Sequence, residues 1–445
     1  MNTPICDFVR QYNEEKSIRM HMPGHKGSSF LGFEHLDITE FDGADDLYHA
    51  SGIIKQSEDN ATKIFGFPTY YSTEGASQCI RAMLYLVLLN AKKNGQKPVI
   101  AAGRNAHKAF VSAAALLDFD IVWLYPKTAE SYLSCNITPN GLEAFLERAE
   151  EKPVAVYLTS PDYLGKTADI EGLSQVCRKH GVLLVVDNAH GAYLKFLEKS
   201  RHPIDLGAHL CCDSAHKTVP VVTGGAYIHI SNELCDFSRE DVKNALALFG
   251  STSPSYLILQ SLDKCNSYLE SYKQKLKEFL PVIAQVKATL EEKGFCFYGD
   301  EPMKLTVCAK EYGYTGNELA DILKLNNIFC EFSDPDYLVL MPTPETKDTE
   351  LQKIADVLTS IPRKKAISIL PPQFVRVEKK MSVREAALSP SEILPIEECE
   401  GRVLSAVTVG CPPAVPIIIC GEKITKEVVD CFRYYGITEC SVVLE

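Results

Sequence analysis

The stretch that decides the fold reads L-L-V-V-D at 183–187 and H-L-C-C-D at 209–213, followed by N-A-H-G-A-Y and S-A-H-K-T respectively. Each run is short, apolar and closed by an aspartate, which is typical of a buried strand that ends at a polar edge. Asp187 closes the first run, and Lys217 lies just past the end of the second. In open α/β sheets, ligands bind outside the carboxyl ends of the strands, where both residues fall.

A lysine and an aspartate at two strand ends suit the chemistry of a pyridoxal cofactor. Lys217 can form a Schiff base with the aldehyde of pyridoxal 5'-phosphate, and Asp187 can keep the pyridine nitrogen protonated, so that the ring withdraws electrons. The plainer interpretation is an aspartate that ends a strand and a lysine that is solvated. The rest of the chain has to decide between the two.

Between residues 61 and 232, short apolar strands alternate with helices of ten or more residues. This alternation predicts parallel βαβ units, and strands that are apolar throughout predict a sheet covered on both faces. The strands are expected at 98–102, 120–124, 154–159, 183–187, 209–213 and 224–230. The predicted class is α/β, a mostly parallel sheet sandwiched by helices in a large domain, with small α+β domains toward the C-terminus.

The pattern changes after about residue 232. A long helical stretch, rich in lysine and glutamate, spans 254–293, and short strands and helices then alternate as in a small α+β domain. The predicted division is an N-terminal segment at 1–60, a large cofactor-binding domain at 61–232, a helical linker with a small α+β domain at 233–362, a linker at 363–373 and a C-terminal domain at 374–445.

Polar side chains gather just past the ends of the predicted strands. Because the carboxyl ends of parallel strands share one edge of a sheet, these residues are expected to converge on one cleft, which favours the cofactor interpretation. They are Asn105, His107, Ser160, Tyr163, Asp187, His190, Ser214, His216 and Lys217.

Two further segments could bind an anion. Small and hydroxyl residues crowd the start of a long apolar helix at 72–77, where free N–H groups and the helix dipole suit a phosphate, although serine and threonine also favour an ordinary N-cap. The turn M-P-G-H-K-G at 22–27 could form a backbone cradle, but a structural loop is favoured, because the turn matches neither common glycine-rich phosphate motif.

The composition excludes several classes of protein. The 445 residues carry a net charge of −12, so the surface as a whole is not a nucleic-acid footprint. The sixteen cysteines include no C-x-x-C pair and no spacing typical of zinc, which predicts a reduced, cytoplasmic protein without a metal site. No apolar run approaches the roughly 18–20 residues of a membrane span, and the N-terminus is too polar for a signal peptide.

Several polar and glycine-containing motifs follow one another along the chain. They are H-M-P-G-H-K-G at 21–27, D-I-T-E…G-A-D-D-L-Y at 37–48, G-R-N-A-H-K at 103–108, P-D-Y-L-G at 161–165, D-N-A-H-G-A at 187–192, S-A-H-K-T at 214–218 and P-P-x-x-P…G-E-K-I-T at 412–425. With these motifs in this order, the chain resembles over nearly its whole length the bacterial ornithine/lysine/arginine decarboxylases, of the aspartate-aminotransferase fold type (pyridoxal fold type I), and their short members in particular. Single motifs such as S-x-H-K occur across pyridoxal enzymes, but the ordered set is specific.

This resemblance implies pyridoxal 5'-phosphate as the cofactor. It also implies decarboxylation of arginine, lysine or ornithine to agmatine, cadaverine or putrescine plus CO2. Lys217 would bind the cofactor covalently, Asp187 would pair with the pyridinium nitrogen, and His107 would stack on the ring; Lys217 and His107 are the candidate proton donors. The other implied contacts are Ala76, Ser77, Ser214 and His216 around the phosphate, His190 near the ring, Gly75 and Ser160 elsewhere in the cofactor site, and Glu422 at the distal cation of the substrate.

Four positions depart from the pattern of the family. Glu74-Gly75-Ala76 replaces Asn-Gly-Thr, so one hydroxyl contact with the phosphate is lost unless backbone N–H groups replace it. Ala414 replaces the glycine of P-P-G-x-P, and Asn188 stands where glutamate is common.

Alternative functions remain open at this point. Transamination needs an arginine for the α-carboxylate, and Arg363, Arg376 and Arg402 are available; aldol cleavage is another reaction of the same cofactor. A non-catalytic homologue that regulates a decarboxylase is disfavoured because it would not need Lys217. The fold type implies a homodimer or higher homo-oligomer with shared active sites, toward which the N-terminal segment would reach. No nucleic-acid or membrane partner is expected, and the sequence does not choose among the three substrates.

Overall fold

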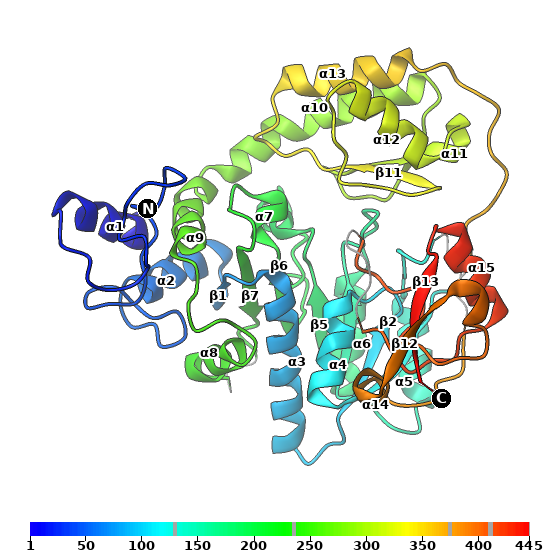
Figure 1. Cartoon of the computed structure of the whole chain (residues 1–445), viewed down its shortest axis with the longest axis horizontal. Helices are drawn as coiled ribbons and strands as arrows, with labels where there is room; N and C mark the ends of the chain where they lie inside the picture. The colour runs from blue at the N-terminus through cyan, green and yellow to red at the C-terminus, as the bar shows by residue number, and fades with distance from the viewer. Residues whose placement is uncertain (128–130, 234–236, 373–375, 408–412, 445) are drawn as a thin grey trace. The chain divides into compact units, whose positions relative to one another are not determined.

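The computed structural model describes residues 1–127, 131–233, 237–372, 376–407 and 413–444. The predicted domain border at 374 and the end of the predicted linker at 373 lie outside these residues. The chain divides into two compact units (Figure 1). The first unit comprises Met1–Lys97, Val154–Val156 and Ile170–Leu276, and the second comprises Pro98–Pro153, Tyr157–Asp169 and Lys277–Glu445.

The main sheet has seven strands. They are β1 (Thr69–Ser72), β2 (Val99–Gly103), β3 (Asp120–Leu124), β4 (Ala155–Thr159), β5 (Leu183–Asp187), β6 (Leu210–Asp213) and β7 (Ala226–Ile230). Their order is β1-β7-β6-β5-β4-β2-β3. The β5–β6 and β2–β3 pairs are parallel, whereas β7 is antiparallel to β6 and to β1. This mostly parallel sheet confirms the predicted α/β class.

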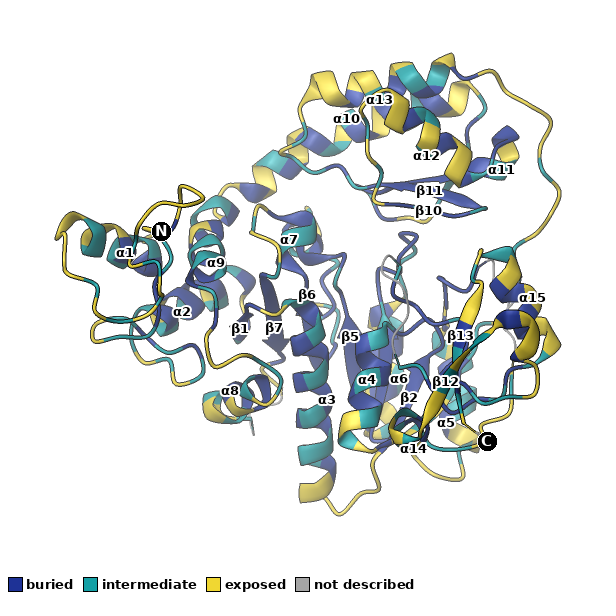
Figure 2. Ribbon diagram, viewed as in Figure 1, coloured by how far each residue is buried: buried dark blue, intermediate teal, exposed yellow. Residues whose placement is uncertain are grey.

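Burial along the strands follows their place in the sheet. β6 and β7 are buried at every position, and Figure 2 shows the strands in the middle of the sheet in the colour of buried residues. The expectation of full cover is wrong for β3, whose residues alternate between exposed and half-buried up to Leu124. β3 stands last in the strand order, so nothing in the sheet pairs with its outer edge.

Helix α3 (Gly75–Lys93) packs against β1, β5, β6 and β7 in the first unit. Its first turn follows β1 directly, and Ser72 Oγ accepts a hydrogen bond from the N–H of Glu74 at 3.1 Å. The other helices of this unit are α1 (Pro4–Glu14), α2 (Ile53–Phe65), α6 (Ile170–His180), η1 (Ala192–Phe196), α7 (Ala215–Thr218), α8 (Arg239–Ala247) and α9 (Tyr256–Leu269), and α10 (Tyr272–Glu292) begins in it.

The M-P-G-H-K-G segment lies in turns of the loop between α1 and α2. His25 Nε2 lies 3.2 Å from Asp37 Oδ2, and His25 Nδ1 accepts a hydrogen bond from the N–H of Gly27 at 3.0 Å. Glu34 accepts hydrogen bonds from three successive N–H groups of the same loop, of residues 30–32. These contacts fix the loop internally, as the structural interpretation of the segment expects.

The second unit contains a four-stranded antiparallel sheet of order β10-β11-β9-β8. Its strands are β8 (Phe297–Tyr298), β9 (Leu305–Cys308), β10 (Phe332–Ser333) and β11 (Tyr337–Leu340). Helices α11 (Ala309–Tyr312), α12 (Gly316–Leu325) and α13 (Asp348–Ser360) accompany it. α12 begins with a capping box, in which Thr315 and Glu318 each accept a hydrogen bond from the other's backbone N–H. This is the small α+β arrangement that the sequence predicts.

The stretch 254–293, expected as one long helical region, forms two helices, because α9 ends at Leu269 and α10 begins at Tyr272. In the C-terminal part of the second unit, strands β12 (Ser391–Pro395) and β13 (Glu439–Val443) form an antiparallel pair. The sequence did not predict this pairing. Its remaining helices are α14 (Val383–Leu388), η2 (Ile396–Glu398) and α15 (Lys426–Tyr434).

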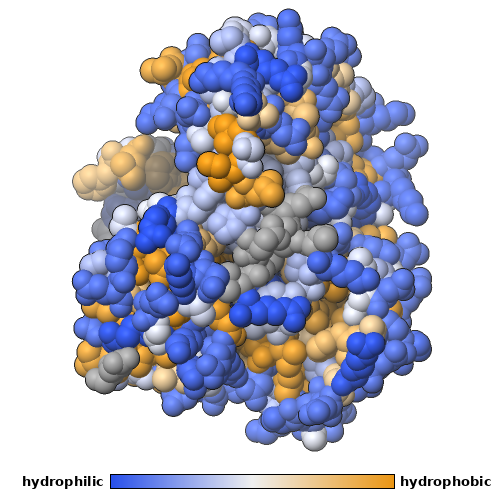
Figure 3. All heavy atoms as spheres, turned by 90° about the vertical axis from the view of Figure 1, so that its right-hand side faces the viewer, coloured by the Kyte–Doolittle hydropathy of each residue, from blue (hydrophilic) through white to orange (hydrophobic). Residues whose placement is uncertain are grey.

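The second unit also contains α4 (Lys108–Leu117) and α5 (Pro139–Arg148). α5 starts as its sequence predicts, with Thr138 as N-cap and proline at the first helical position. The face drawn in Figure 3 is largely hydrophilic, with smaller apolar areas between the polar side chains. In the part of the chain that the structure describes, no helix has the length and apolar character of a membrane span.

Candidate active site

Lys217 lies in α7, the one-turn helix that directly follows β6, and its side chain is half-buried. Its Nζ is 3.0 Å from Nε2 of His190, which follows β5. His190 is buried. The segments that follow two neighbouring parallel strands therefore place the amine of Lys217 and the imidazole of His190 within hydrogen-bond distance of each other.

Asp187 is the last residue of β5 and is 2% exposed. Its Oδ1 accepts a hydrogen bond from the N–H of Ala189 at 3.1 Å, and the thiol of Cys212 donates a longer, weaker hydrogen bond to the same atom at 3.7 Å. The register of β5 against β6 places Asp187 opposite Cys212, five residues before Lys217. Asp187 thus ends one strand, and Lys217 follows the neighbouring strand; the sequence predicts the two strand ends but not that the strands are neighbours.

The predicted phosphate contacts of the first unit come from the starts of two helices. Gly75, Ala76 and Ser77 form the first turn of α3, and Ser214 is the N-cap residue of α7. Gly75 has φ +71°, and a Cβ added there would meet nothing within 4 Å, so the turn is open on that side. Open space at a helix N-terminus beside hydroxyl groups fits a phosphate. The residues present therefore suit pyridoxal phosphate.

A cluster around Asp213, the last residue of β6, was missed by sequence reasoning. Asp213 Oδ2 accepts hydrogen bonds from Nε2 of His202 at 3.3 Å and from Nε2 of His229 at 3.1 Å, and Oδ1 accepts one from the amide of Asn188 at 2.7 Å. All four side chains are completely buried. The sequence indicates only that Asp213 ends a strand. His202 and His229 lie apart in the sequence, and no local pattern indicates that both contact Asp213.

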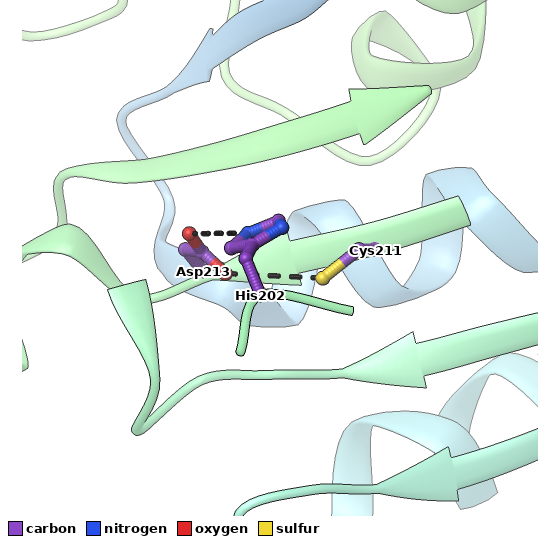
Figure 4. A group of neighbouring side chains, drawn as sticks. All are labelled: His202, Cys211 and Asp213. Carbon is purple, nitrogen blue, oxygen red and sulfur yellow. Dashed lines mark hydrogen bonds and ion pairs between the residues drawn. The ribbon is translucent and has the colours of Figure 1, made fainter. Parts of the chain in front are cut away.

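Figure 4 shows His202, Cys211 and Asp213 side by side. One nitrogen, sulfur or oxygen atom of each lies within 4.8 Å of the others, a spacing that could hold a metal ion. However, His202 Nδ1 accepts a hydrogen bond from the N–H of Ile204 at 3.3 Å while its Nε2 donates to Asp213. Both nitrogens of His202 are therefore already engaged in the hydrogen-bond network around Asp213.

Three predicted site residues belong to the second unit. His107 is the N-cap residue of α4, and its Nδ1 accepts a hydrogen bond from the N–H of Ala109 at 3.1 Å. Ser160, just after β4, accepts one from the N–H of Ala168 at 3.0 Å. Their contacts with the cofactor stay predictions, as does the substrate contact of Glu422.

Glu422 is 5% exposed and has partners within its own unit. Its Oε2 lies 3.4 Å from the guanidinium of Arg104 and accepts a hydrogen bond from the N–H of Ile419 at 2.8 Å. Arg104 also donates to the carbonyls of Pro416 and Ile417, at 3.1 and 2.9 Å. Burial raises the pKa of Glu422, although Arg104 opposes that effect. Any contact with a substrate would have to compete with this ion pair.

Ala414, which departs from the glycine of the family motif, has φ +60° and is 1% exposed. Its carbonyl accepts a hydrogen bond from the N–H of Lys108, the residue after His107, at 2.8 Å. A left-handed conformation is unfavourable for alanine and unstrained for glycine. The structure thus explains why glycine suits this position.

Comparison with known proteins decides the family. The model of the Orn/Lys/Arg decarboxylase major domain matches residues 3–306, and that of the C-terminal domain matches residues 366–441. The chain belongs to the Orn/Lys/Arg decarboxylase family. As a member of this family, it is an enzyme that decarboxylates an amino acid with pyridoxal phosphate, as the sequence predicted.

Relatives extend over the whole chain. YaaO, an uncharacterised protein of Bacillus subtilis (strain 168), is 30% identical over 96% of this chain and 93% of its own length. The arginine decarboxylase of the same organism is 27% identical over 96% and 92%. Among solved structures, the lysine decarboxylase LdcF of Francisella novicida has a TM-score of 0.81 at 17% identity, over 99% of this chain and 81% of its own. The last likeness confirms the fold, pyridoxal fold type I.

Proposed function

We propose that this decarboxylase releases CO2 from a basic amino acid, with arginine as the first candidate and lysine and ornithine as the alternatives. The observation that carries the proposal is the meeting of Lys217 and His190 beside the buried Asp187. The choice of arginine is supported by relatives that bear the name arginine decarboxylase and match at least 94% of this chain.

Pyridoxal phosphate supplies an electron-withdrawing ring when it is bound. Lys217 is the residue that holds it covalently, because its amine is the nucleophile at the strand ends. Asp187 keeps the ring nitrogen protonated, since a buried carboxylate stabilises a positive charge beside it. The first turn of α3, with Gly75 and Ser77, binds the phosphate through N–H and hydroxyl groups.

His190 gives Lys217 a proton partner. Its Nε2 is 3.0 Å from the lysine Nζ, so a proton can pass between imidazole and amine without a movement of the backbone. The imidazole can accept the proton that the lysine must lose before it acts as a nucleophile. It can return a proton when the lysine serves as the donor to the carbon that has lost CO2.

The test is a panel of arginine, lysine and ornithine, with CO2 release, amine and keto acid all measured. The protein with pyridoxal phosphate should have a visible absorbance band and form CO2 and an amine, most rapidly from arginine. Lys217→Ala should lose the band and all CO2 release, because no other group can hold the cofactor covalently. The exposed Lys199→Ala is the matched control and should keep both.

Two outcomes would overturn the proposal. A wild-type protein that stays colourless with added cofactor would remove its basis. Formation of keto acid without CO2 would instead support the transamination that the arginines at 363, 376 and 402 left open. A preference for lysine or ornithine would correct the substrate and leave the reaction class intact.

We also propose that two copies of the chain form a homodimer, in the cytoplasm. The loop between α1 and α2 exposes large apolar side chains, with exposed fractions of 87% for Ile18, 86% for Met20, 81% for Phe30 and 76% for Leu31. Exposed apolar residues so close in sequence are costly to leave in water, which supports cover by a second chain. None of the cysteines among the described residues forms a disulfide, which supports a reducing compartment.

Light scattering after size exclusion tests the dimer. The native protein should have twice the chain mass of 49.3 kDa. Phe30→Ser with Leu31→Ser should shift the protein toward the monomer, because the change removes exposed apolar surface. The loop should keep its conformation, since Glu34 binds backbone N–H groups that the substitutions do not alter. Exposed Leu325→Ser, far from that loop in sequence, is the control. A native monomer, or a dimer unchanged by the double variant, would contradict this assembly.

A further inference from the structure

Asp213 lies where the two segments of the site meet. It ends β6 immediately before the residues 214–217 that carry Lys217. Asn188, its partner, follows Asp187 at the end of β5 and precedes His190 by two positions. The 2.7 Å hydrogen bond from the amide of Asn188 to Asp213 Oδ1 therefore links the lysine-bearing segment to the loop 187–191.

The carboxylate of Asp213 is itself held in place. His202 and His229 both donate to Oδ2 through Nε2, and Nδ1 of His229 lies 2.9 Å from the hydroxyl of Thr69. Burial alone would raise the pKa of Asp213, but the two histidines outweigh burial and keep it below its ordinary value. The acceptor is therefore an ionised carboxylate, whose hydrogen bonds are stronger than those of a neutral group.

Asn188 connects Asp213 to the backbone of the loop 187–191. Its N–H donates to the carbonyl of Cys212 at 3.0 Å, and its carbonyl accepts from the N–H of Gly191 at 2.7 Å. A Cβ on Gly191 would lie 2.0 Å from Asn188 Oδ1, so only glycine leaves room for the amide in this orientation. The residues between these anchors include His190, whose imidazole meets Lys217.

We propose that Asp213 is a positioning residue, which holds the loop 187–191 through Asn188 and thereby sets His190 and Asp187 relative to Lys217. The inference rests on the proposed role of Lys217 in binding the cofactor. It requires that Asp213 and Asn188 act as one unit. It also requires that the cluster works without a metal ion, although its donor atoms are spaced for one.

Asn188→Ala and Asp213→Asn, alone and together, test the inference. Asn188→Ala removes the link and leaves the carboxylate with its histidines, so it decides the question even if Asp213→Asn fails to fold. Cys177→Ala is the matched control, because Cys177 is a buried cysteine of α6 in the same unit and forms no hydrogen bond with Asn188 or Asp213 among the described residues. The double variant should be no worse than the poorer single one.

Two measurements go beyond activity. In the full chain without cofactor, hydrogen exchange at Ala189 and Gly191 should accelerate about tenfold in Asn188→Ala, because the loop loses an anchor. With cofactor, the midpoint of the pH titration of the visible band should move by about one pH unit, since the groups around Lys217 shift. We expect kcat to fall about 10²-fold, with a smaller change in KM.

The outcomes separate this inference from the proposed function. If neither wild type nor any variant shows a visible band, the proposed role of Lys217 is refuted. Hydrogen exchange at Ala189 and Gly191, measured without cofactor, still tests whether the hydrogen bond from Asn188 to Asp213 holds the loop. If the band is present but neither its titration nor the exchange differs from wild type in Asn188→Ala, the positioning role is refuted. About one equivalent of bound metal that is lost in Cys211→Ala would also overturn it and assign the cluster to a metal ion.

Discussion

Two buried carboxylates, Asp213 in the first unit and Asp334 in the second, behave in opposite ways. In the first unit, burial would raise the pKa of Asp213, but its two histidine partners hold it below the ordinary value. In the second unit, burial raises the pKa of Asp334 to about 7, against hydrogen bonds from the N–H groups of Tyr337 and Asp336. Glu422 has a raised pKa in spite of Arg104.

The difference teaches that burial alone does not decide the charge of a carboxylate. Asp213 accepts hydrogen bonds from His202, His229 and Asn188, and a longer contact from the thiol of Cys211 at 3.9 Å. Asp334 has two backbone donors and a second carboxylate, Asp336, as a neighbour. Asp213 is thus kept ionised in the unit that contains Lys217, while Asp334 and Glu422 of the second unit have raised pKa values and tend to hold a proton.

The largest effect in this comparison is expected at the buried pair of the second unit. Glu422→Ala leaves the always-charged guanidinium of Arg104 without its carboxylate and should cost about 3–5 kcal/mol of the free energy of unfolding. Arg104→Met should cost less, because Glu422 can take up a proton once its partner is gone. Urea unfolding measures both.

Exposed Glu439→Ala is the control for that pair and should leave the free energy of unfolding nearly unchanged. Equal costs for Glu422→Ala and Arg104→Met would show that the carboxylate keeps its charge. Glu422 would then be ionised, as Asp213 is, and the contrast between these two buried carboxylates would disappear.

The contributions of Asp334 and Asp213 to the pH dependence of stability should have opposite signs. The folded-state pKa of Asp334 lies above its ordinary value of 3.8, so the folded protein holds a proton that the unfolded chain has released as the pH rises toward about 7. Its contribution to the free energy of unfolding therefore falls over that range, and Asp334→Asn should flatten the fall. Asp213 has a lowered pKa, so its contribution is present above its ordinary pKa and is lost as the pH falls below it.

Urea unfolding from pH 4 to pH 8, of wild type and Asp334→Asn, checks this. The two curves should differ most at the alkaline end, where the wild-type carboxyl is forced to ionise while buried. Asp321→Asn, at an exposed position of α12, is the control and should follow the wild type. Parallel curves for Asp334→Asn and wild type would mean that Asp334 is ionised throughout, as Asp213 is.

The smallest effect concerns the backbone of the second unit. Ala414→Gly should stabilise the protein by about 0.5–1 kcal/mol, because glycine relieves the left-handed conformation at φ +60° but has more freedom in the unfolded chain. Thermal unfolding measures the gain. Ala386→Gly, inside α14, should destabilise instead and serves as the control. A loss of stability in Ala414→Gly would mean that the turn is not strained.

Much of the first unit could be predicted, because its signals are local. Short apolar runs that end in aspartate predicted β5 and β6, and placed Lys217 and His190 just past two strand ends at one edge of the sheet; that the two strands are neighbours comes from the structure. The expectation of cover on both faces is wrong for β3, since edge position depends on the strand order and not on the apolar content of D-I-V-W-L. The ordered motifs predicted the family and the cofactor.

The amino-acid sequence by itself thus determined the alternation of strands and helices, the family, and the lysine and aspartate of the site. Only the tertiary structure decided which buried charges meet: His202 and His229 around Asp213, and Arg104 with Glu422, which are 318 positions apart. The physical reason is that periodicity and turn chemistry act over a few residues. The partner of a buried charge is instead chosen by packing, which brings distant segments together.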